Sequence, residues 1–310
     1  MITYWETGAA FKRLSEYQPK CWVNSQELTA EEVEILIDKY DVPRDFIVDV
    51  LDTDERSRIE NDDDGTVMII LRIPLNNQNN GIPFITVPLG VILSEKHIVT
   101  ICPRRNEVIP SLIKGVNDNR IRITNQVDYV LRIFLISAVW FLQFLKAINV
   151  QTALIEKDLE NATKNQELHK LLRMEKCLVF FITSLKSNEM VLARMRNNKN
   201  IKGVDYDEDL MEDVVIETRQ ALEMANVYSD IQTSMMDAFA SVISNNLNVI
   251  MKQLTSITIV LMIPTLIASL YGMNIPNGFE SSPFAFGYIV AISVILTIVG
   301  IMLFKWKNWF

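Results

Sequence analysis

The sequence predicts an α+β protein with an N-terminal α/β domain, a stalk of long helices similar to a coiled coil, and two C-terminal transmembrane helices. Three observations support this fold class. Strand-like runs rich in Val, Ile and Thr lie in the first third of the chain. Helical sequence with few breakers follows from Val127 onward. Two apolar stretches, 254–273 and 283–304, each approach the length of roughly 20 residues that a helix needs to cross a bilayer. The predicted divisions are 1–120, 121–252 and 253–310.

The first domain has recognisable helix and strand signals. Thr29 is a suitable N-cap for a helix that ends near Tyr40, and Pro43 can open a second short helix that runs through Asp49. The acidic turn 61–65 has the composition of a calcium loop, but an EF-hand requires a glutamate at its twelfth position, where this chain has Ile73. We therefore predict a hairpin turn there. The predicted strands are Thr66–Ile73, Phe84–Leu93 and His97–Cys102.

The helical region raises the question of a third span. Ile133–Leu145 is strongly apolar, but only about 13 residues separate Arg132 from Lys146, against the roughly 20 that a bilayer requires. We therefore predict a buried core helix. Turns are expected near 162–165 and 197–203.

A single helix is predicted from about Tyr206 to Met273, because only Pro264 interrupts it. At 1.5 Å per residue it would be on the order of 100 Å long. Such a helix is not stable alone in water and must pack against others, most simply those of identical neighbours. The sequence thus predicts a homo-oligomer whose stalk continues into a membrane span.

The charge distribution bounds the function and the orientation. The net charge of −8 belongs almost entirely to the soluble part and argues against nucleic-acid binding. Lys252 precedes the first span, Lys305 and Lys307 follow the second, and the loop between the spans has no basic residue. The positive-inside rule then places both termini in the cytoplasm, in a multi-pass protein of the cell (inner) membrane that contacts lipid.

No enzyme chemistry is indicated. Cys21, Cys102 and Cys177 are widely spaced and are expected to be reduced thiols, and His97 and His169 are too far apart in sequence to suggest a zinc site. The chain has no phosphate-binding loop and no nucleophile or cofactor motif.

One face of the long helix is small or polar. A monomer cannot shield this face from lipid, whereas several copies around an axis could turn it inward. The stripe alone is compatible with close helix packing and with a pore, because Ser and Thr also bond to their own helix and small residues line ordinary interfaces. Asn248 and Asn274 at the two ends favour a pore. The pore-lining candidates are Asn248, Met251, Thr255, Thr258, Met262, Thr265 and Ser269, and the face assigned as opposite carries Ile259, Ile263, Leu266, Ile267 and Leu270.

Two motifs support a family resemblance. Gly272-Met273-Asn274 follows Tyr271 at the end of the first of two C-terminal spans, and Asp52–Glu60 contains an acid-Arg-x-Arg-x-Glu pattern. Together they resemble the CorA family of magnesium channels across nearly the whole chain. The loop 275–280 departs from the acidic Met-Pro-Glu-Leu that often follows Gly-Met-Asn in that family, which puts the ion preference in doubt more than the fold.

The resemblance implies a pentamer that lets Mg²⁺, with Co²⁺ and Ni²⁺ as further candidates, enter down its electrochemical gradient. It implies a selectivity filter of Gly272, Met273 and Asn274, with Asn274 as a metal-interacting residue. It also implies regulatory Mg²⁺ that holds the channel shut, for which Asp213 and Asp237 fall at matching places. Asp213 belongs to an acidic run, 205–217, which is equally explained as a solvated helix start that complements the helix dipole.

Two other functions remain open. A zinc transporter of the same superfamily is possible, although its tripeptide usually varies, whereas Gly-Met-Asn is intact here. A membrane-anchored coiled-coil signalling protein is the other alternative, but the short loop between the spans leaves no room for an outer sensing domain.

Overall fold

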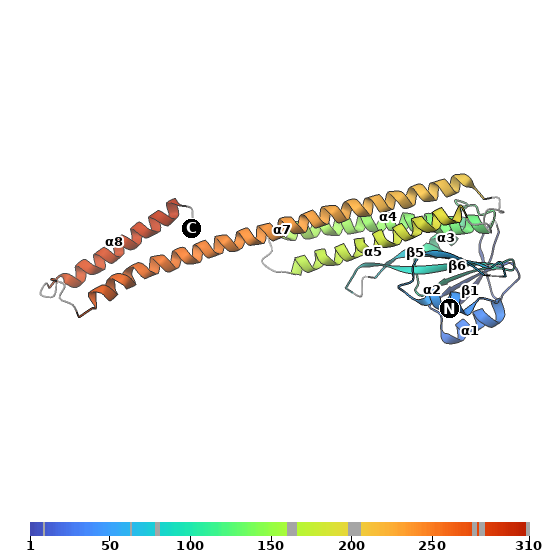
Figure 1. Ribbon diagram of the computed structural model, residues 1–310, viewed down its shortest axis with the longest axis horizontal. Helices are drawn as coiled ribbons and strands as arrows, with labels where there is room; N and C mark the ends of the chain where they lie inside the picture. Colours follow the sequence, from blue (N-terminus) through green and yellow to red (C-terminus); the bar gives the residue numbers. More distant parts are fainter. Residues whose placement is uncertain are drawn as a thin grey trace. The chain divides into compact units, whose positions relative to one another are not determined.

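The computed structural model describes residues 1–8, 10–62, 64–77, 81–159, 166–197, 206–274, 278 and 283–307. The chain forms two compact units, Met1–Thr233 and Ser234–Phe310. Helix α7 (Glu208–Tyr271) contributes residues to both (Figure 1). The predicted division at residues 120 and 252 remains a prediction. The turn expected near 162–165 lies outside the described residues, as does the turn expected near 197–203 apart from Asn197.

A seven-stranded sheet organises the first unit, in the order β2-β1-β3-β7-β6-β5-β4. Neighbouring strands are antiparallel except β3 and β7, which pair in parallel. The three predicted strands are present as β5, β6 and β7. Four further strands were not predicted. The strands are β1 (Ile2–Glu6), β2 (Lys12–Leu14), β3 (Trp22–Gln26), β4 (Arg58–Asn61), β5 (Val67–Asn76), β6 (Phe84–Leu93) and β7 (Ile98–Cys102).

Helices cover both faces of the sheet. Alternate residues of a strand point to opposite faces, so the central strands, buried on both sides, are almost uniformly apolar. On β5, Met68 and Ile70 face α1 (Ala30–Tyr40) and α2 (Arg44–Leu51). Ile69 and Leu71 belong to the core on the other face, with α3 (Val108–Asn117), α4 (Gln126–Leu159), α5 (Gln166–Met195) and the first part of α7.

Local signals explain where these elements begin and how closely they pack. The Thr29 hydroxyl accepts a hydrogen bond from the Glu32 backbone N–H, and the Glu32 carboxylate accepts one from the Thr29 N–H, so α1 begins with a capping box. Gly90 on β6 allows α2 to approach, since a Cβ there would lie 2.3 Å from Val50 Cγ2. The predicted N-cap at Thr29 is confirmed.

The α4 helix is a core helix of the first unit. Three helices in the described part of the chain, α4, α7 and α8 (Ala285–Trp306), are long and apolar enough to cross a membrane. The apolar window of α4 is 44% buried inside the protein, against 11% for α7 and 0% for α8. Phe134, Phe141 and Leu145 lie in the core, and Phe141 packs edge-on against Phe181 of α5. The prediction that Ile133–Leu145 belongs to a buried core helix is confirmed.

The second unit is a helical hairpin made by the last part of α7 and α8. Ser256 is fully buried, and Val260, Ile263 and Ile267 are half-buried. A Cβ on Gly300 would lie 3.1 Å from Ile263 Cδ1, so glycine at this position allows the two helices to pack closely. α7 continues through Pro264, as predicted, and ends at Tyr271. Residues 275–277 and 279–282 of the predicted loop lie outside the described residues.

Candidate functional site

The polar stripe of α7 is exposed in the single chain. All seven pore-lining candidates are exposed, and the side chains of Met251 and Met262 are 63% and 62% exposed. The side of α7 that is buried or half-buried in the second unit carries Ser256, Val260, Ile263 and Ile267 instead. These residues recur at helical spacing, so they form one face, and the stripe lies on another. The hairpin therefore leaves the stripe available to a partner outside this chain.

Two hydroxyl groups of the stripe bond to their own helix. Thr258 Oγ1 donates to the Leu254 carbonyl at 2.8 Å, and Thr265 Oγ1 donates to the Leu261 carbonyl at 3.0 Å. Each hydroxyl proton is thereby used, but each hydroxyl oxygen keeps acceptor capacity. The stripe can thus accept hydrogen bonds from water at these positions without leaving a donor unpaired.

The face assigned as opposite to the stripe needs a correction. Ile263 and Ile267 are half-buried, but Ile259, Leu266 and Leu270 are 41%, 62% and 61% exposed. At roughly 100° per residue, Ile259 and Leu266 project beside the stripe rather than away from it. Grouping apolar residues by type, without their angular positions, produced the error.

The Gly-Met-Asn tripeptide directly follows the end of α7. The Gly272 N–H donates to the Ala268 carbonyl at 2.9 Å and completes the last turn of the helix. A Cβ at Gly272 would lie 3.3 Å from that same carbonyl oxygen, which is a tight contact. Met273 is 48% exposed and Asn274 is exposed. The tripeptide therefore presents its side chains and its backbone beyond the helix end.

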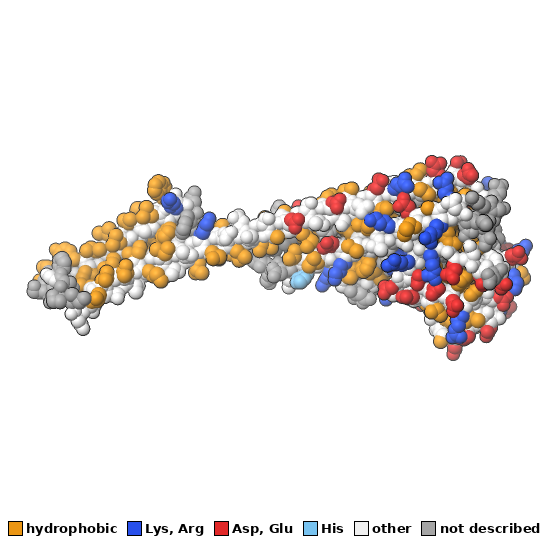
Figure 2. All heavy atoms as spheres, viewed as in Figure 1, with side chains coloured by type: hydrophobic (Ala, Val, Ile, Leu, Met, Phe, Trp, Pro, Cys, Tyr) orange, Lys and Arg blue, Asp and Glu red, His pale blue; other side chains and the backbone are white. Residues whose placement is uncertain are grey.

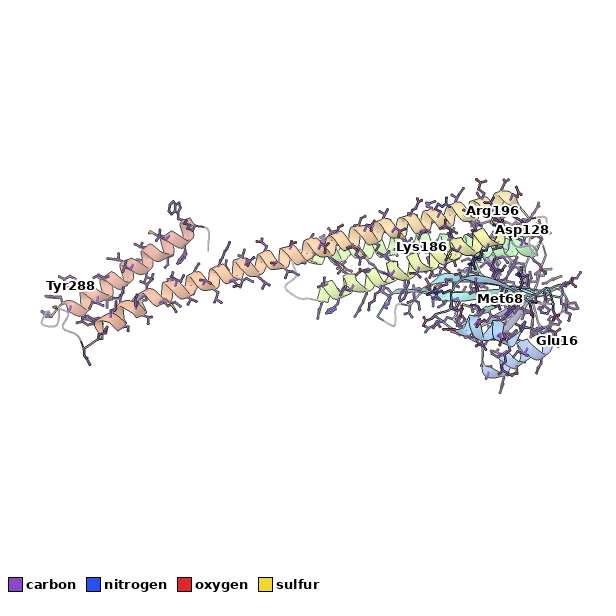
Figure 3. All side chains as sticks on the ribbon, viewed as in Figure 1. Glu16, Met68, Asp128, Lys186, Arg196 and Tyr288 are labelled. Atoms are coloured by element: carbon purple, nitrogen blue, oxygen red, sulfur yellow. The ribbon has the colours of Figure 1, made fainter. Side chains whose placement is uncertain are left out.

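The acidic run at the start of α7 is in part a helix cap. Asp207 Oδ1 accepts from the Leu210 N–H at 3.1 Å, and the Asp207 N–H donates to Asp128 Oδ1 at 3.4 Å. Asp128 lies at the start of α4 (Figure 3). Glu208 and Asp209 occupy the first turn, where acids complement the helix dipole. These contacts give part of the run a structural role, and Asp205 lies outside the described residues.

The two proposed regulatory acids belong to the same helix, α7, but to different units. Asp213 lies in the first unit and Asp237 in the second, and both are exposed. Among the described residues, no group of three or more His, Cys, Asp or Glu side chains could hold a metal ion.

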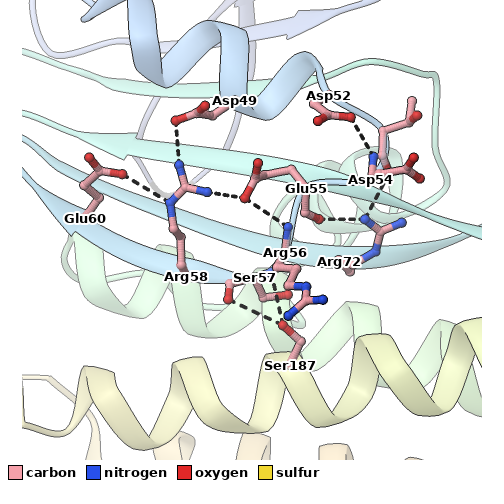
Figure 4. A network of polar contacts seen from close by, with 11 residues as sticks. Asp49, Asp52, Asp54, Glu55, Arg56, Ser57, Arg58, Glu60, Arg72 and Ser187 are labelled. Carbon is pink, nitrogen blue, oxygen red and sulfur yellow. Dashed lines mark hydrogen bonds and ion pairs between the residues drawn. The ribbon is translucent and has the colours of Figure 1, made fainter.

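The Asp52–Glu60 motif forms an ionic cluster around Arg58 (Figure 4). Its guanidinium contacts Asp49 Oδ2 at 2.5 Å, Glu60 Oε2 at 3.2 Å, and Glu55. Partial burial acts to lower the pKa of Arg58, but the hydrogen bond that Arg58 donates to Glu60 and the charges of Glu55 and Asp49 outweigh burial and raise the pKa. Arg58 is thus paired with two acids of its own motif, Glu55 and Glu60, and with Asp49 of α2.

A second part of this motif joins the sheet to α5. Asn188 of α5 lies at the centre, because its Oδ1 accepts from Ser57 Oγ at 2.8 Å and from the Arg72 N–H at 2.9 Å. Its Nδ2 donates to the Arg72 carbonyl at 2.8 Å. The Arg72 guanidinium donates to the backbone carbonyls of Glu55 at 2.6 Å and of Thr86 at 2.7 Å. The roles of Arg72 and Asn188 were not predicted, and no local sequence signal marks them.

Comparison with known proteins assigns the chain to a family. The pattern of the family described as "CorA-like Mg2+ transporter protein" matches residues 18–306. The chain belongs to this family. It is therefore a membrane transporter of the CorA magnesium and cobalt transport family and not an enzyme, with apolar helices at its C-terminus.

Individual relatives agree with this assignment. The cobalt/magnesium transport protein CorA of Methanocaldococcus jannaschii is 25% identical over 292 residues, which cover 93% of this chain and 90% of the relative. The magnesium transport protein CorA of Helicobacter pylori is 28% identical over 243 residues, covering 75% and 74%. The complete structure of the CorA magnesium transporter from M. jannaschii matches with a TM-score of 0.83 at 24% identity, over 100% of this chain and 99% of that one. The predicted fold class and family are confirmed.

Proposed function

We propose that five copies of the chain form a channel that lets Mg²⁺ enter the cell down its electrochemical gradient, with Co²⁺ and Ni²⁺ as further substrates. The chain would cross the cell membrane twice, with both termini in the cytoplasm. The observation that supports this most is the uncovered polar stripe of α7, from Asn248 to Ser269, which leads to Gly272, Met273 and Asn274. Pentamer formation is what the family resemblance implies.

Assembly is expected because exposing the polar stripe to lipid would cost free energy. Hydroxyl and amide groups that face hydrocarbon lose their hydrogen bonds to water. α8 leaves this face of α7 uncovered, so other copies of the chain are the simplest partners. Around a common axis the stripes would line a water-filled path.

The chemistry of Mg²⁺ suits neutral acceptors. The ion is small, octahedral and slow to lose its water, so a site can hold the hydrated ion by accepting hydrogen bonds from that water. The Asn274 carbonyl and the free lone pairs of Thr258 and Thr265 provide such acceptors. They attract a cation without binding it so tightly that it stalls. A divalent ion that moves inward gains about 2.3 kcal/mol per charge per 100 mV, so transport needs no nucleotide.

Intracellular Mg²⁺ is proposed to regulate the channel through Asp213 and Asp237. Both side chains are exposed on α7, so a regulatory ion could bridge acids of neighbouring chains. Such bridging would remove like-charge repulsion between stalks and favour the closed state. The ion can shift the equilibrium only if it binds the closed arrangement more tightly than the open one.

Ion flux into liposomes tests the proposal. Asn274→Ala is expected to abolish Mg²⁺ uptake while the assembly survives on size exclusion, because the filter loses its carbonyl oxygen. Asn246→Ala is the matched control, since Asn246 is an exposed asparagine of α7 off the stripe. Normal uptake by well-assembled Asn274→Ala would refute the filter. Offering Mg²⁺, Co²⁺, Ni²⁺ and Zn²⁺ in turn separates this function from zinc transport, and no uptake of any ion by the wild type would favour a signalling role.

A further inference from the structure

The two helices of the second unit enclose an apolar groove on the hairpin surface. Ile257, Val260 and Leu261 of α7 and Ile301 and Lys305 of α8 line it. We call these five residues the hairpin groove, which has a volume of about 450 Å³. Four of its five side chains are aliphatic, and the fifth carries a full positive charge. An occupant must therefore combine hydrocarbon with an anionic group.

The distribution of charge in this part of the chain narrows the choice of occupant. From residue 238 onward the sequence has only four charged side chains, Lys252, Glu280, Lys305 and Lys307. In the sequence Glu280 falls between the end of α7 and the start of α8, whereas Lys305 belongs to the last turn of α8. Figure 2 shows apolar side chains over both helices and basic ones only near the end where the chain terminates. Among the described residues from 238 onward, Lys305 thus has no acidic side chain as a possible partner.

A second copy of the hairpin would fill the groove poorly. It could supply apolar side chains, but it carries the same four charges and would bring more lysines rather than a carboxylate to the level of Lys305. Covering a lysine in an apolar interface without an anionic partner is costly. A phospholipid with a net negative charge supplies both parts, because its acyl chain can lie along the aliphatic wall while its phosphate contacts the ammonium group.

We propose that the hairpin groove binds one anionic phospholipid, with the acyl chain against Ile257, Leu261 and Ile301 and the phosphate at Lys305. Trp306, whose side chain is 80% exposed, follows directly and has the amphipathic ring that favours the membrane–water interface. The bound lipid contacts both helices and so joins them at their lysine-bearing end. This binding does not depend on ion conduction.

Native mass spectrometry of the full-length protein in detergent tests the site. The probes are phosphatidylglycerol and phosphatidylcholine with the same acyl chains. The wild type is expected to retain phosphatidylglycerol preferentially, and Lys305→Gln is expected to weaken that binding about fivefold, the factor that corresponds to about 1 kcal/mol per lysine. Lys307→Gln is the matched control. It removes the same charge only two residues from Lys305, but the Lys307 side chain does not line the groove. It is expected to keep the preference.

A second variant tests the apolar wall. Ile301→Trp retains Lys305 but fills the groove, and it is expected to lose phosphatidylglycerol as Lys305→Gln does. Glycerol phosphate, which has the headgroup charge without acyl chains, is expected not to displace the lipid. The proposal is overturned if phosphatidylcholine binds equally well, if both lysine variants lose the lipid to the same extent, or if Ile301→Trp binds like the wild type. Variants are compared only where circular dichroism shows wild-type helix content, and Leu303→Trp, on an exposed position of α8 outside the groove, controls for the added ring.

Discussion

α4 and the last part of α7 are both apolar enough to cross a membrane, yet they find their partners in different places. α4 buries its apolar face against the sheet and α5, whereas the corresponding window of α7 is only 11% buried. The hydropathy of a helix therefore indicates how much apolar surface must be buried. It does not indicate whether that surface is buried by other parts of the chain, by lipid or by another copy of the protein. The structure supplies that information for α4 within one chain. For α7 it shows only the face that packs against α8, and the proposed assembly would cover the rest with lipid and other copies of the chain.

The largest expected effect is the loss of stability when α4 loses a core contact within its own chain. Phe141 is fully buried and packs against Phe181, so Phe141→Ala should cost about 3–5 kcal/mol and lower the Tm of the protein by on the order of 10 °C. Val139→Ala, at a position that is 39% exposed on the same helix, should change the stability by less than about 1 kcal/mol. Thermal unfolding of both variants measures the difference. Equal losses of stability in the two variants would contradict the assignment of Phe141 to a buried face of α4 and Val139 to an exposed one.

Cysteine labelling tests which face of α7 is accessible to water. In a background without Cys21, Cys102 and Cys177, cysteine at Thr258, Met262, Thr265 or Ser269 should react with a small charged thiol reagent in the reconstituted protein. Cysteine at Ile263 or Ile267 should react at least tenfold more slowly, because these side chains are half-buried in the hairpin. Labelling rates by mass spectrometry give the result. Similar rates on both faces would remove the pore and leave simple helix packing.

A smaller effect is expected where α7 begins. Like charges at close range cost on the order of 1 kcal/mol per pair at an intermediate dielectric, so bridging Mg²⁺ should order the stalks. Wild-type protein should be cleaved by a protease in EDTA and protected at millimolar Mg²⁺, whereas Asp213→Lys should resist cleavage in both. Glu223→Lys, at another exposed acid of α7, should behave as the wild type. Equal cleavage of the wild type with and without Mg²⁺ would contradict a regulatory role for the acidic run and leave only its role as a helix cap.

The smallest effect concerns His97, a buried polar side chain of the first unit. Burial lowers its pKa below 6.5, although the Tyr40 carbonyl, 3.0 Å from Nε2, acts to raise it. Lys96 also lowers the pKa, Asp41 raises it, and Tyr17 Oη lies 3.4 Å from Nδ1. The unfolded state therefore binds the proton more readily, and the stabilising effect of neutral His97 is complete above pH 6.5 and is lost as the pH falls through its lower folded pKa.

The direction of this pH dependence can be tested with His169 as a control. Between pH 7 and pH 5, His97→Gln should reduce the fall in Tm shown by the wild type, because the variant has no such proton to take up. His169→Gln should leave the fall unchanged, since His169 is exposed on α5. A steeper fall in His97→Gln than in the wild type would reverse the assignment of the neutral form.

The sequence was most informative where the physical cause is local. Long runs of β-branched residues predicted β5 to β7, and the scarcity of breakers predicted α7 to within a few residues. β1 and β2 are short and mostly unburied, so they carry little periodic signal. β3 is placed by its parallel pairing with β7, more than 70 residues away, which no local pattern encodes.

The candidate site divides in the same way. Helical spacing alone identified the exposed stripe, but the residues that α7 buries in the hairpin depend on α8 and were assigned only in part. The Arg58 motif was recognised as a pattern, whereas its link to Asn188 is a contact between distant segments. The metal roles of Asp213, Asp237 and Asn274 stay predictions, because their proposed partners belong to other chains or to the ion itself.

The parallel pairing of β3 with β7 also has a consequence during synthesis. β3 lies between β1 and β7 in the sheet, so its inner edge stays unpaired until Ile98–Cys102 has left the ribosome. At roughly 5–20 residues per second, the intervening chain takes on the order of ten seconds to appear. For that time the nascent chain exposes a row of backbone N–H and C=O groups that another chain could pair with. The order in which the strands emerge thus leaves this edge of β3 open to pairing with other chains until β7 has been made.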